Sequence, residues 1–270
     1  MTEPPSHDLS IRPIDAIEHL HACEAIGKVV WQVDDREIVP ASHLRAIQHA
    51  GGLVAGAFDG GRLVGFVLGF LARHEPGEPT GLHSHLMGVL SEYRRAGVGR
   101  ALKRFQRAWC LERGLPWITW TFDPLQATHA RRNLEQLGAE AVAYHPDFYG
   151  RLGGVEFGSL ATDRLVARWE LEAPRVVRLA AGGRPDPAPA PAPAALAAGE
   201  DGEPGAPRTD LDAEAVRIEV PSDFAPLLYH DPDRAQAWRR AVRTAMQGYI
   251  DEGYRARRFL DGAYHLERTI

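Results

Sequence analysis

Hydrophobic and polar residues follow two different periods along the chain up to residue 171, and the change between them predicts an order of strands and helices. Alternating or short apolar runs bounded by turn residues predict strands at residues 9–14, 53–58, 63–71, 82–90, 117–122, 142–148 and 165–171. Apolar residues three and four positions apart predict helices after Asp15, at residues 41–50, from Gly97 to Gly114 and at residues 126–137. The order β-α-α-β-β-β-α-β-α-β-β indicates the α/β class, with a mixed sheet flanked by helices.

A change of composition separates this region from the C-terminal part of the chain. Residues 180–207 are rich in Gly, Pro and Ala, with a Pro-Ala alternation over residues 185–193, and such a segment does not form a packed core. Beyond it the pattern predicts a strand at residues 216–220, a helix that opens at Asp231-Pro232, and one or two strands within residues 255–270.

These patterns predict a first domain at residues 1–179, a Pro/Ala/Gly-rich linker at residues 180–210 and a small α+β extension at residues 211–270. An extension of about 60 residues is marginal as an independent folding unit, because it buries too little surface. We therefore expect it to dock on the first domain or on a partner subunit.

Composition and charge narrow the class of protein. The chain has 270 residues, and 31 Lys and Arg against 36 Asp and Glu give a net charge of −5, which argues against a nucleic-acid partner bound through a basic surface. Cys23 and Cys110 are too few for a disulfide framework or a cysteine metal site, so we expect no metal. Residues 1–10 lack the apolar core of a secretion signal and no stretch approaches 18 apolar residues, so we expect a cytoplasmic protein that does not bind a membrane.

The segment Val89–Leu102 carries the most specific motif, a strand joined to a helix through a turn with two glycines. The first N–H groups of a helix have no partner within the helix and carry a partial positive charge, and glycine lets a phosphate approach the backbone closely. A lone Gly-x-Gly is more often only a tight turn, but here an amphipathic helix follows, and Arg94, Arg95 and Arg100 add cationic donors. The dinucleotide and P-loop spacings are both absent. The motif therefore predicts a phosphate site.

The sequence Arg94-x-x-Gly97-x-Gly99 resembles the acyl-CoA signature of the GNAT superfamily of N-acetyltransferases, and the element order from Leu9 to Leu171 resembles their fold. The resemblance implies an N-acyltransferase with acetyl-CoA or another acyl-CoA as co-substrate. It also implies that backbone amides of the turn hold the pyrophosphate, while the strand edge before it pairs with the pantetheine arm and polarises the thioester carbonyl. The residues expected to bind the cofactor are Met87, Gly88, Val89, Arg94, Arg95, Ala96, Gly97, Val98, Gly99 and Arg100.

Four further segments look like a little-characterised bacterial branch of the superfamily: residues 83–85, 119–124, 148–150 and 162–164. Some relatives of that kind are associated with N-succinylation of amino acids from succinyl-CoA. The resemblance therefore implies a small-molecule amine or amino acid as acceptor and allows a homodimer. The alternatives are transfer of an acetyl or other short acyl group to a primary amine, transfer of succinyl to an amino acid, acylation of a protein, and a non-catalytic acyl-CoA-binding module.

Two histidines are candidates for the base that takes the proton of the attacking amine. Histidine titrates near neutral pH, and His83 and His85 lie two positions apart on one strand, so alternation places them on one face with Met87 and Val89. The His-x-His arrangement is similar to serotonin N-acetyltransferase, where such a pair is implicated in relaying the proton through water. The alternative is a pair of hydrogen-bonded core histidines.

The acid that protonates the departing thiolate is less clear from the sequence. Many GNAT enzymes carry a tyrosine for this role at a position that Leu134 occupies here, so Tyr144 and Tyr149 become the candidates, although either could be only a half-buried aromatic residue. The candidate substrate-binding residues are Trp120, Asp123 and Arg164. Asp123 could bind the amine or cap the next helix, and Arg164 could meet a charged substrate or pair with the neighbouring Asp163.

Overall fold

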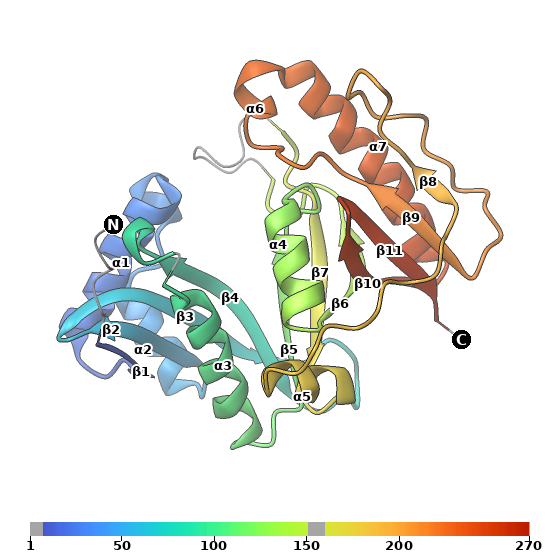
Figure 1. Ribbon diagram of the computed structural model, residues 1–270. Coiled ribbons are helices and arrows are strands. Elements are labelled where there is room, and N and C mark those ends of the chain that lie inside the picture. The colour runs from blue at the N-terminus through green and yellow to red at the C-terminus, as the bar shows by residue number, and fades with distance from the viewer. Residues whose placement is uncertain (1–7, 95, 151–159, 270) are drawn as a thin grey trace, which may run out of the picture. The chain divides into compact units, whose positions relative to one another are not determined.

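The computed structural model describes residues 8–94, 96–150 and 160–269 (Figure 1). It consists of two compact units, Met1–Ile118 and Thr119–Ile270. The boundary falls inside a strand that the sequence pattern assigns to the first domain. The domain limits at residues 179 and 210 remain predictions.

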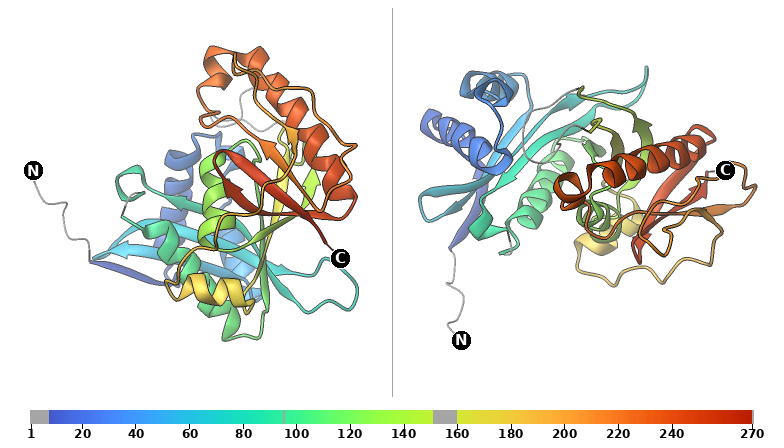
Figure 2. Two further views of the ribbon diagram at one scale, coloured as in Figure 1. Left: turned by 45° about the vertical axis from the view of Figure 1, so that its right-hand side comes forward. Right: turned by 90° about the horizontal axis from the view of Figure 1, so that it is seen from above.

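Unit 1 is built on four strands, β1 (Leu9–Pro13), β2 (Leu53–Asp59), β3 (Arg62–Ala72) and β4 (Gly81–Val89), in antiparallel order β1-β2-β3-β4. Its helices are α1 (Ile17–Trp31), α2 (Ala41–His49) and α3 (Val98–Leu111), with short 3-10 turns η1 (Asp35–Glu37) and η2 (Ser91–Tyr93). Figures 1 and 2 show α1 and α2 on one face of the strands and α3 on the other. Strands β2 and β3 are covered on both faces, which explains why they read as nearly continuous apolar runs.

Unit 2 contains strands in the order β5-β7-β6-β10-β11-β9-β8. The strands are β5 (Trp117–Phe122), β6 (Glu140–His145), β7 (Arg164–Glu170), β8 (Ala194–Leu196), β9 (Ala215–Glu219), β10 (Tyr254–Leu260) and β11 (Ala263–Arg268). The β8–β9 pair is parallel, and the pairs β6–β7, β6–β10, β10–β11 and β9–β11 are antiparallel. The helical segments are α4 (Ala127–Arg131), η3 (Arg132–Gln136, π-helical), α5 (Pro174–Ala180), α6 (Leu227–His230) and α7 (Pro232–Asp251). The expected fold class, a mixed sheet flanked by helices, is confirmed.

The C-terminal extension is part of unit 2. Ala256 of β10 pairs with Ala141 of β6, so the extension continues the strand order of the preceding region. Helix α7 packs against β6, β8, β9 and β10 (Figure 2). The apolar stripe predicted for this helix, Trp238 and Val242 included, is buried.

The segment expected to be a linker contains ordered structure. Strand β8 lies within it, and its residues Ala195 and Leu196 are fully buried. Before β8, the carboxylate of Asp186 accepts hydrogen bonds from Arg175 and Arg178 of α5. The Pro-Ala composition did not reveal this strand, because its pairing partner β9 lies about twenty residues further along the chain and supplies the contacts that fix it.

Helix ends agree with the sequence pattern in part. Asp231 caps α7, because its side chain accepts a hydrogen bond from the amide of Arg234. Asp15 does not cap α1, whose N-cap is Ala16, with no side-chain hydrogen bond at that position. The helix predicted at residues 126–137 is divided into α4 and the π-helical η3 before Gly138, which has the expected positive φ of 76°.

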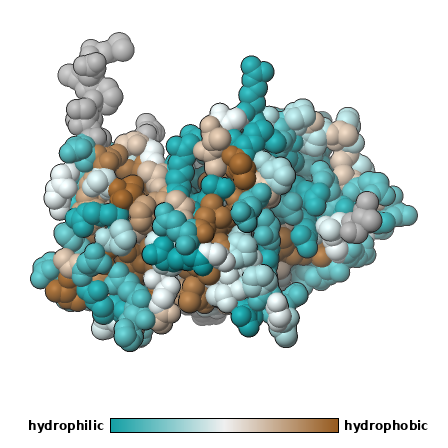
Figure 3. Space-filling model, turned by 90° about the horizontal axis from the view of Figure 1, so that it is seen from below, coloured by the Kyte–Doolittle hydropathy of each residue, from teal (hydrophilic) through white to brown (hydrophobic). Residues whose placement is uncertain are grey.

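The surface drawn in Figure 3 is mainly hydrophilic, with hydrophobic residues exposed between the polar ones. In the part of the chain that the structure describes, the large exposed apolar side chains are Ile17, Val29, Phe70, Leu71, Phe148, Val177 and Tyr229. Within the described residues, no helix has the length and apolar character needed to cross a bilayer.

Candidate active site

The turn between β4 and α3 has the geometry of an anion site. Gly97 is the N-cap of α3 and has a left-handed φ of 79°, a conformation that favours glycine. Among the residues that the structure describes, and apart from the neighbours of Gly97 in the chain, a Cβ atom added at Gly97 would meet no heavy atom within 4 Å, so the described backbone is open to an approaching ligand. No side chain caps the start of α3 among the described residues, and this leaves the first N–H groups of the helix for an external acceptor.

Neighbouring contacts hold this turn on the β2–β3 hairpin. The Tyr93 hydroxyl donates to the Asp59 carboxylate at 2.8 Å, and Arg62 pairs with Glu92 at 3.3 Å. Arg94 donates from Nε to the Val89 carbonyl at 3.3 Å and is exposed.

The other residues expected to bind the cofactor surround the same turn. Ala96, Gly97 and Arg100 are exposed, Gly99 is half-buried and Val98 is buried, whereas Arg95 lies outside the described residues. In β4, Met87 and Val89 are half-buried and Gly88 is buried. The structure therefore brings the described members of this set together along the end of β4 and the start of α3, with two exposed arginines beside the helix N-terminus.

The two candidate bases lie together on β4. The His83 and His85 rings are 6.3 Å apart, and both contact Phe70, at centroid distances of 5.2 Å and 5.7 Å. Burial lowers the pKa of His83 to about 4, helped by the charges of His85, His74 and Lys103. Burial also lowers the pKa of His85 below its ordinary value. Both rings are therefore neutral near pH 7, the form that can accept a proton.

A β-bulge at His85 corrects the expectation that His83, His85, Met87 and Val89 form one row. Leu68 of β3 pairs with Leu86 and Gly69 pairs with Ser84, so His85 is an extra residue in β4. Ser84 accepts a hydrogen bond from Lys103 of α3 at 2.8 Å, whereas Leu86 lies against α1 on the other face. The alternation reverses at the bulge, so His83 lies on the α1 face and Met87 on the α3 face.

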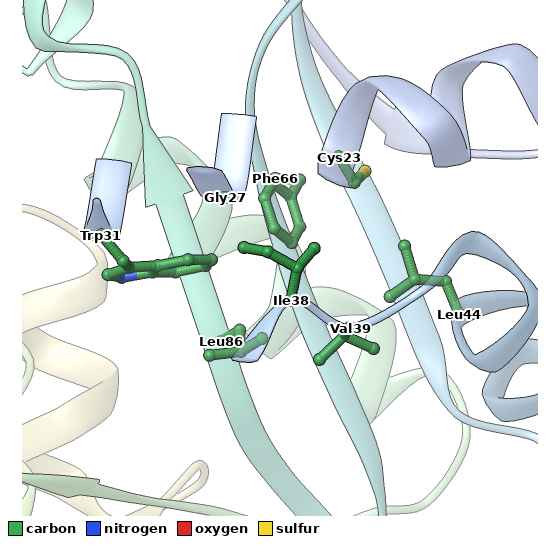
Figure 4. Close-up of a pocket in the computed structure, with 8 residues that line it drawn as sticks. All are labelled: Cys23, Gly27, Trp31, Ile38, Val39, Leu44, Phe66 and Leu86. Carbon is green, nitrogen blue, oxygen red and sulfur yellow. The ribbon is translucent and has the colours of Figure 1, made fainter. Parts of the chain in front are cut away.

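A small apolar cavity lies on the α1 face of this strand (Figure 4). Its lining residues are Cys23, Gly27, Trp31, Ile38, Val39, Leu44, Phe66 and Leu86. The cavity has a volume of about 10 Å³, which is room for one water-sized sphere, and its lining is apolar. Burial raises the pKa of the Cys23 thiol to about 12, so this sulfur is a packing group and not a thiolate nucleophile.

In unit 2, Asp123 is already paired. Arg239 of α7 donates to both of its oxygens, at 2.8 Å and 2.6 Å, and Asp123 also accepts from the Leu125 amide at 2.9 Å. Arg164 lies 4.0 Å from the same carboxylate, which is only 8% exposed. The geometry favours a structural carboxylate that orders the turn after β5 over a free carboxylate that binds an amine.

Trp120 and Arg164, the other expected substrate residues, are also buried. Trp120 packs edge to face against Trp169, with ring centroids 6.1 Å apart. Arg164 donates to the backbone carbonyl of Asp163 at 2.9 Å. The side chains of Asp163 and Arg164 therefore do not pair with each other as their sequence positions allowed.

Tyr144 is held by a buried carboxylate. Its hydroxyl donates to Asp163 at 2.5 Å, and burial together with the Asp163 charge raises the pKa of Tyr144 above its ordinary value. A phenol with a raised pKa and an existing acceptor is a weak proton donor for a second group. The geometry therefore disfavours Tyr144 as the general acid.

Tyr149 is the more accessible of the two tyrosines. It is half-buried, and its hydroxyl lies 3.0 Å from the Thr121 hydroxyl near the end of β5. The guanidinium of Arg164 lies 5.3 Å from the centre of its ring. Tyr149 therefore remains the candidate acid of unit 2.

The sequence did not single out Arg239 and Arg243, which bind Asp123 and Asp163 from α7. The spacing of these two arginines in the sequence could have indicated that they act together. Two arginines four positions apart on a helix lie on one side of it, and both border the buried stripe of Trp238 and Val242.

Comparison with known proteins is consistent with the motif and the element order. Residues 14–139 match the acetyltransferase (GNAT) family model. No curated protein sequence matches the chain.

Several solved structures are similar to about 60% of the chain. The protein yncA of Salmonella typhimurium, solved with its cofactor acetyl-CoA, is 19% identical, with 61% of this chain and 95% of that chain covered and a TM-score of 0.48. The ribosomal-protein-S18-alanine N-acetyltransferase of Escherichia coli is 15% identical, with coverages of 60% and 94% and a TM-score of 0.48. A GNAT-family protein of Desulfovibrio desulfuricans is 16% identical, with coverages of 60% and 99% and a TM-score of 0.49. Residues 14–139, slightly less than half of the chain, are thus similar to the acetyltransferase domains of the GNAT family.

Proposed function

We propose that the protein is an acyl-CoA-dependent N-acyltransferase, which moves an acetyl or other short acyl group from the CoA thioester to a primary amine by direct attack in a ternary complex. The observation that carries the proposal is the start of α3 at Gly97, which no described side chain caps and which lies in the sequence that resembles the acyl-CoA signature, within the family match. The partial positive charge of this helix end and the exposed Arg94 and Arg100 suit the CoA pyrophosphate.

The reaction needs a base and an acid. The amine nitrogen attacks the thioester carbonyl carbon, a C–N bond forms, the C–S bond breaks, and the amine loses a proton while the thiolate gains one. We assign the base role to His85, directly or through a water held with His83, because both rings are neutral near pH 7. We assign the acid role to Tyr149, because the hydroxyl of Tyr144 is committed to Asp163.

The rival function is an acyl-CoA-binding module without catalysis. It is favoured by Leu134, which occupies the position of the usual general acid and is fully buried. The two functions differ in one measurable property, the release of free CoA thiol that depends on an added amine.

The test combines ligand identification with turnover. Mass spectrometry of the purified protein is expected to find CoA or an acyl-CoA, and calorimetry to measure its affinity. A thiol-release assay with acetyl-CoA and succinyl-CoA over a panel of amines and amino acids then identifies the acyl group and the acceptor. Amine-independent binding alone would identify the non-catalytic module, and a protein that binds no CoA would refute both functions.

A further inference from the structure

Asp163, just before β7, is the centre of a buried hydrogen-bond network. Its carboxylate accepts from Arg243 Nε at 2.8 Å and Nη2 at 2.5 Å, from the Tyr144 hydroxyl at 2.5 Å, and from the Asp147 amide at 3.0 Å. Asp163 is fully buried, so these donors replace the water that a carboxylate would otherwise bind. Arg243 is the only ionised donor among these groups, and it comes from α7, 80 residues further along the chain.

A series of hydrogen bonds leads from Asp163 to Tyr149. Asp147 has a left-handed φ of 46°, a sparsely populated backbone conformation for a non-glycine residue, and its carboxylate accepts from the Thr162 amide at 3.1 Å. The Thr162 hydroxyl then accepts from the Tyr149 amide at 3.0 Å and donates to the Gly150 carbonyl at 2.9 Å. Thr162 therefore fixes the backbone of Tyr149, Asp147 holds Thr162, and Asp163 holds Asp147.

We infer that Arg243 is a positioning residue, which holds Tyr149 in place from the C-terminal extension through Asp163; the catalytic part of this inference rests on the proposed function. Without the guanidinium, the buried Asp163 carboxylate keeps only neutral donors. It then takes up a proton or admits water, and either change alters its bond to the Asp147 amide. Asp147 loses the restraint on its left-handed backbone, and Tyr149 loses its fixed geometry relative to Thr121.

The test compares three substitutions on α7 in the full-length protein. Arg243→Gln removes the charge, Arg243→Lys keeps it, and Arg240→Gln makes the same chemical change at an exposed position of the same helix. Hydrogen exchange of the Asp147 and Tyr149 amides reports directly on the network and does not depend on knowing the substrate. We expect exchange at both amides to rise by roughly tenfold or more in Arg243→Gln, less in Arg243→Lys, and not at all in Arg240→Gln.

Kinetics tests the link to Tyr149 through a double-mutant cycle. Arg243→Gln should lower kcat by roughly tenfold with unchanged KM for the acyl-CoA, and should have little further effect in a Tyr149→Phe background, because both changes disturb the same group. Equal losses of kcat in both backgrounds, accompanied by a lower Tm, would show that Arg243 acts only on stability. Unchanged amide exchange in a folded Arg243→Gln protein would overturn the inference outright.

The design separates failure of this inference from failure of the proposed function. If no acyl-CoA and amine support turnover in the wild-type protein, the proposed function fails, and the amide exchange still decides whether Arg243 holds the loop. If the wild-type protein is active and Tyr149→Phe has normal turnover, Tyr149 is not the acid and the catalytic part of the inference is refuted.

Discussion

Ser84 and Leu86 lie two residues apart in β4, yet Ser84 binds Lys103 of α3 and Leu86 contacts the α1 side of the sheet. The bulge at His85 is the cause, since it inserts one residue into the register with β3. Bulges commonly re-aim a side chain beside an active site. Here the bulged residue is the proposed base itself.

His85→Ala should lower the acyl-transfer rate by roughly a hundredfold or more while leaving the affinity for CoA nearly unchanged, because proton transfer is lost and the phosphate turn is untouched. His49→Ala, at the end of α2, is a control histidine change away from β4. Turnover, CoA affinity and Tm are measured on the same samples. Wild-type turnover in a folded, CoA-competent His85→Ala protein would remove His85 from the mechanism.

The pH dependence of the rate distinguishes the two histidines. A base acts in its neutral form, so the rate falls as the pH drops through its pKa. If His85 is the base, the fall should lie somewhat below pH 6.5, because burial lowers the pKa of His85 from that value. If His83 is the base, the fall should lie near pH 4, its lowered pKa. A fall above pH 7 would exclude both.

The same lowering of pKa predicts a pH dependence of stability. His83 titrates near 6.5 in the unfolded chain and near 4 in the native one, so the unfolded state binds more protons between these values. The free energy of unfolding should therefore decrease as the pH falls from 6.5 to 4. In His83→Phe this decrease should be smaller, as measured by urea denaturation at several pH values. An unchanged pH slope would show that His83 is not buried in its neutral form.

The phosphate turn is tested by two glycines of equal conformation. Gly97 at the start of α3 and Gly114 after its end both have positive φ, 79° and 66°, and among the described residues nothing beyond their chain neighbours lies within 4 Å of a Cβ added at either position. Replacement of either by Ala should destabilise the protein by roughly 1–2 kcal/mol. Only Gly97→Ala should also weaken CoA binding, as measured by calorimetry, because only this turn faces the proposed ligand. Equal CoA affinities in the two variants would count against the turn as the pyrophosphate site.

Removal of one partner of the buried Asp123–Arg239 ion pair should lower the free energy of unfolding. Arg239→Met removes the guanidinium that donates to both carboxylate oxygens, leaves the more distant Arg164 at 4.0 Å, and should lower the free energy of unfolding by about 3–5 kcal/mol. Arg240→Met, the exposed neighbour, should change it little. The double variant Asp123→Asn with Arg239→Met should recover part of the loss. Urea denaturation curves measure all three, and an equal loss in the double variant would indicate a packing role for the Arg239 side chain.

Strand β8 changes what deletion of the Pro-Ala segment should do. The composition alone predicts that residues 188–198 are dispensable, but Leu196 is 1% exposed and lies in β8. Leu196→Ala should therefore destabilise the protein by about 2–5 kcal/mol. Ala190→Ser, at an exposed position of the same segment, is expected to be neutral. A similar Tm for both variants would restore the interpretation of this region as a linker without a core.

Elements whose signals are local could be predicted from the sequence. The hairpin of β2 and β3 follows from Asp59-Gly60-Gly61, where Gly60 has a φ of 58°, and helix α7 follows from its cap at Asp231 and its apolar stripe. The glycine turn before α3 was predicted for the same reason, since its residues are adjacent in the chain.

Features that depend on distant residues could not be predicted. The bulge at His85 depends on how β4 pairs with β3, and no residue type in His83-Ser84-His85 marks it. Asp123 pairs with Arg239, which lies 116 positions away in the chain. The residues around Asp123 therefore predicted only a free carboxylate or a helix cap. The burial of Tyr144 likewise depends on Asp163 and on α7. The residues next to Tyr144 in the sequence do not indicate these contacts.

The arginines of the extension also constrain when unit 2 can fold during synthesis. Arg239, Arg243 and Arg258 bind carboxylates that precede them by 116, 80 and 123 residues. Until the ribosome has released α7 and β10, Asp123, Asp163 and Glu135 have no cationic partner from the extension, and the β6 edge is unpaired at Ala141. Contacts of such long range form slowly, and an open strand edge invites pairing with other chains. We therefore expect the nascent protein to be most exposed to aggregation in the interval between synthesis of β7 and of β10, and a chaperone to have its greatest effect there.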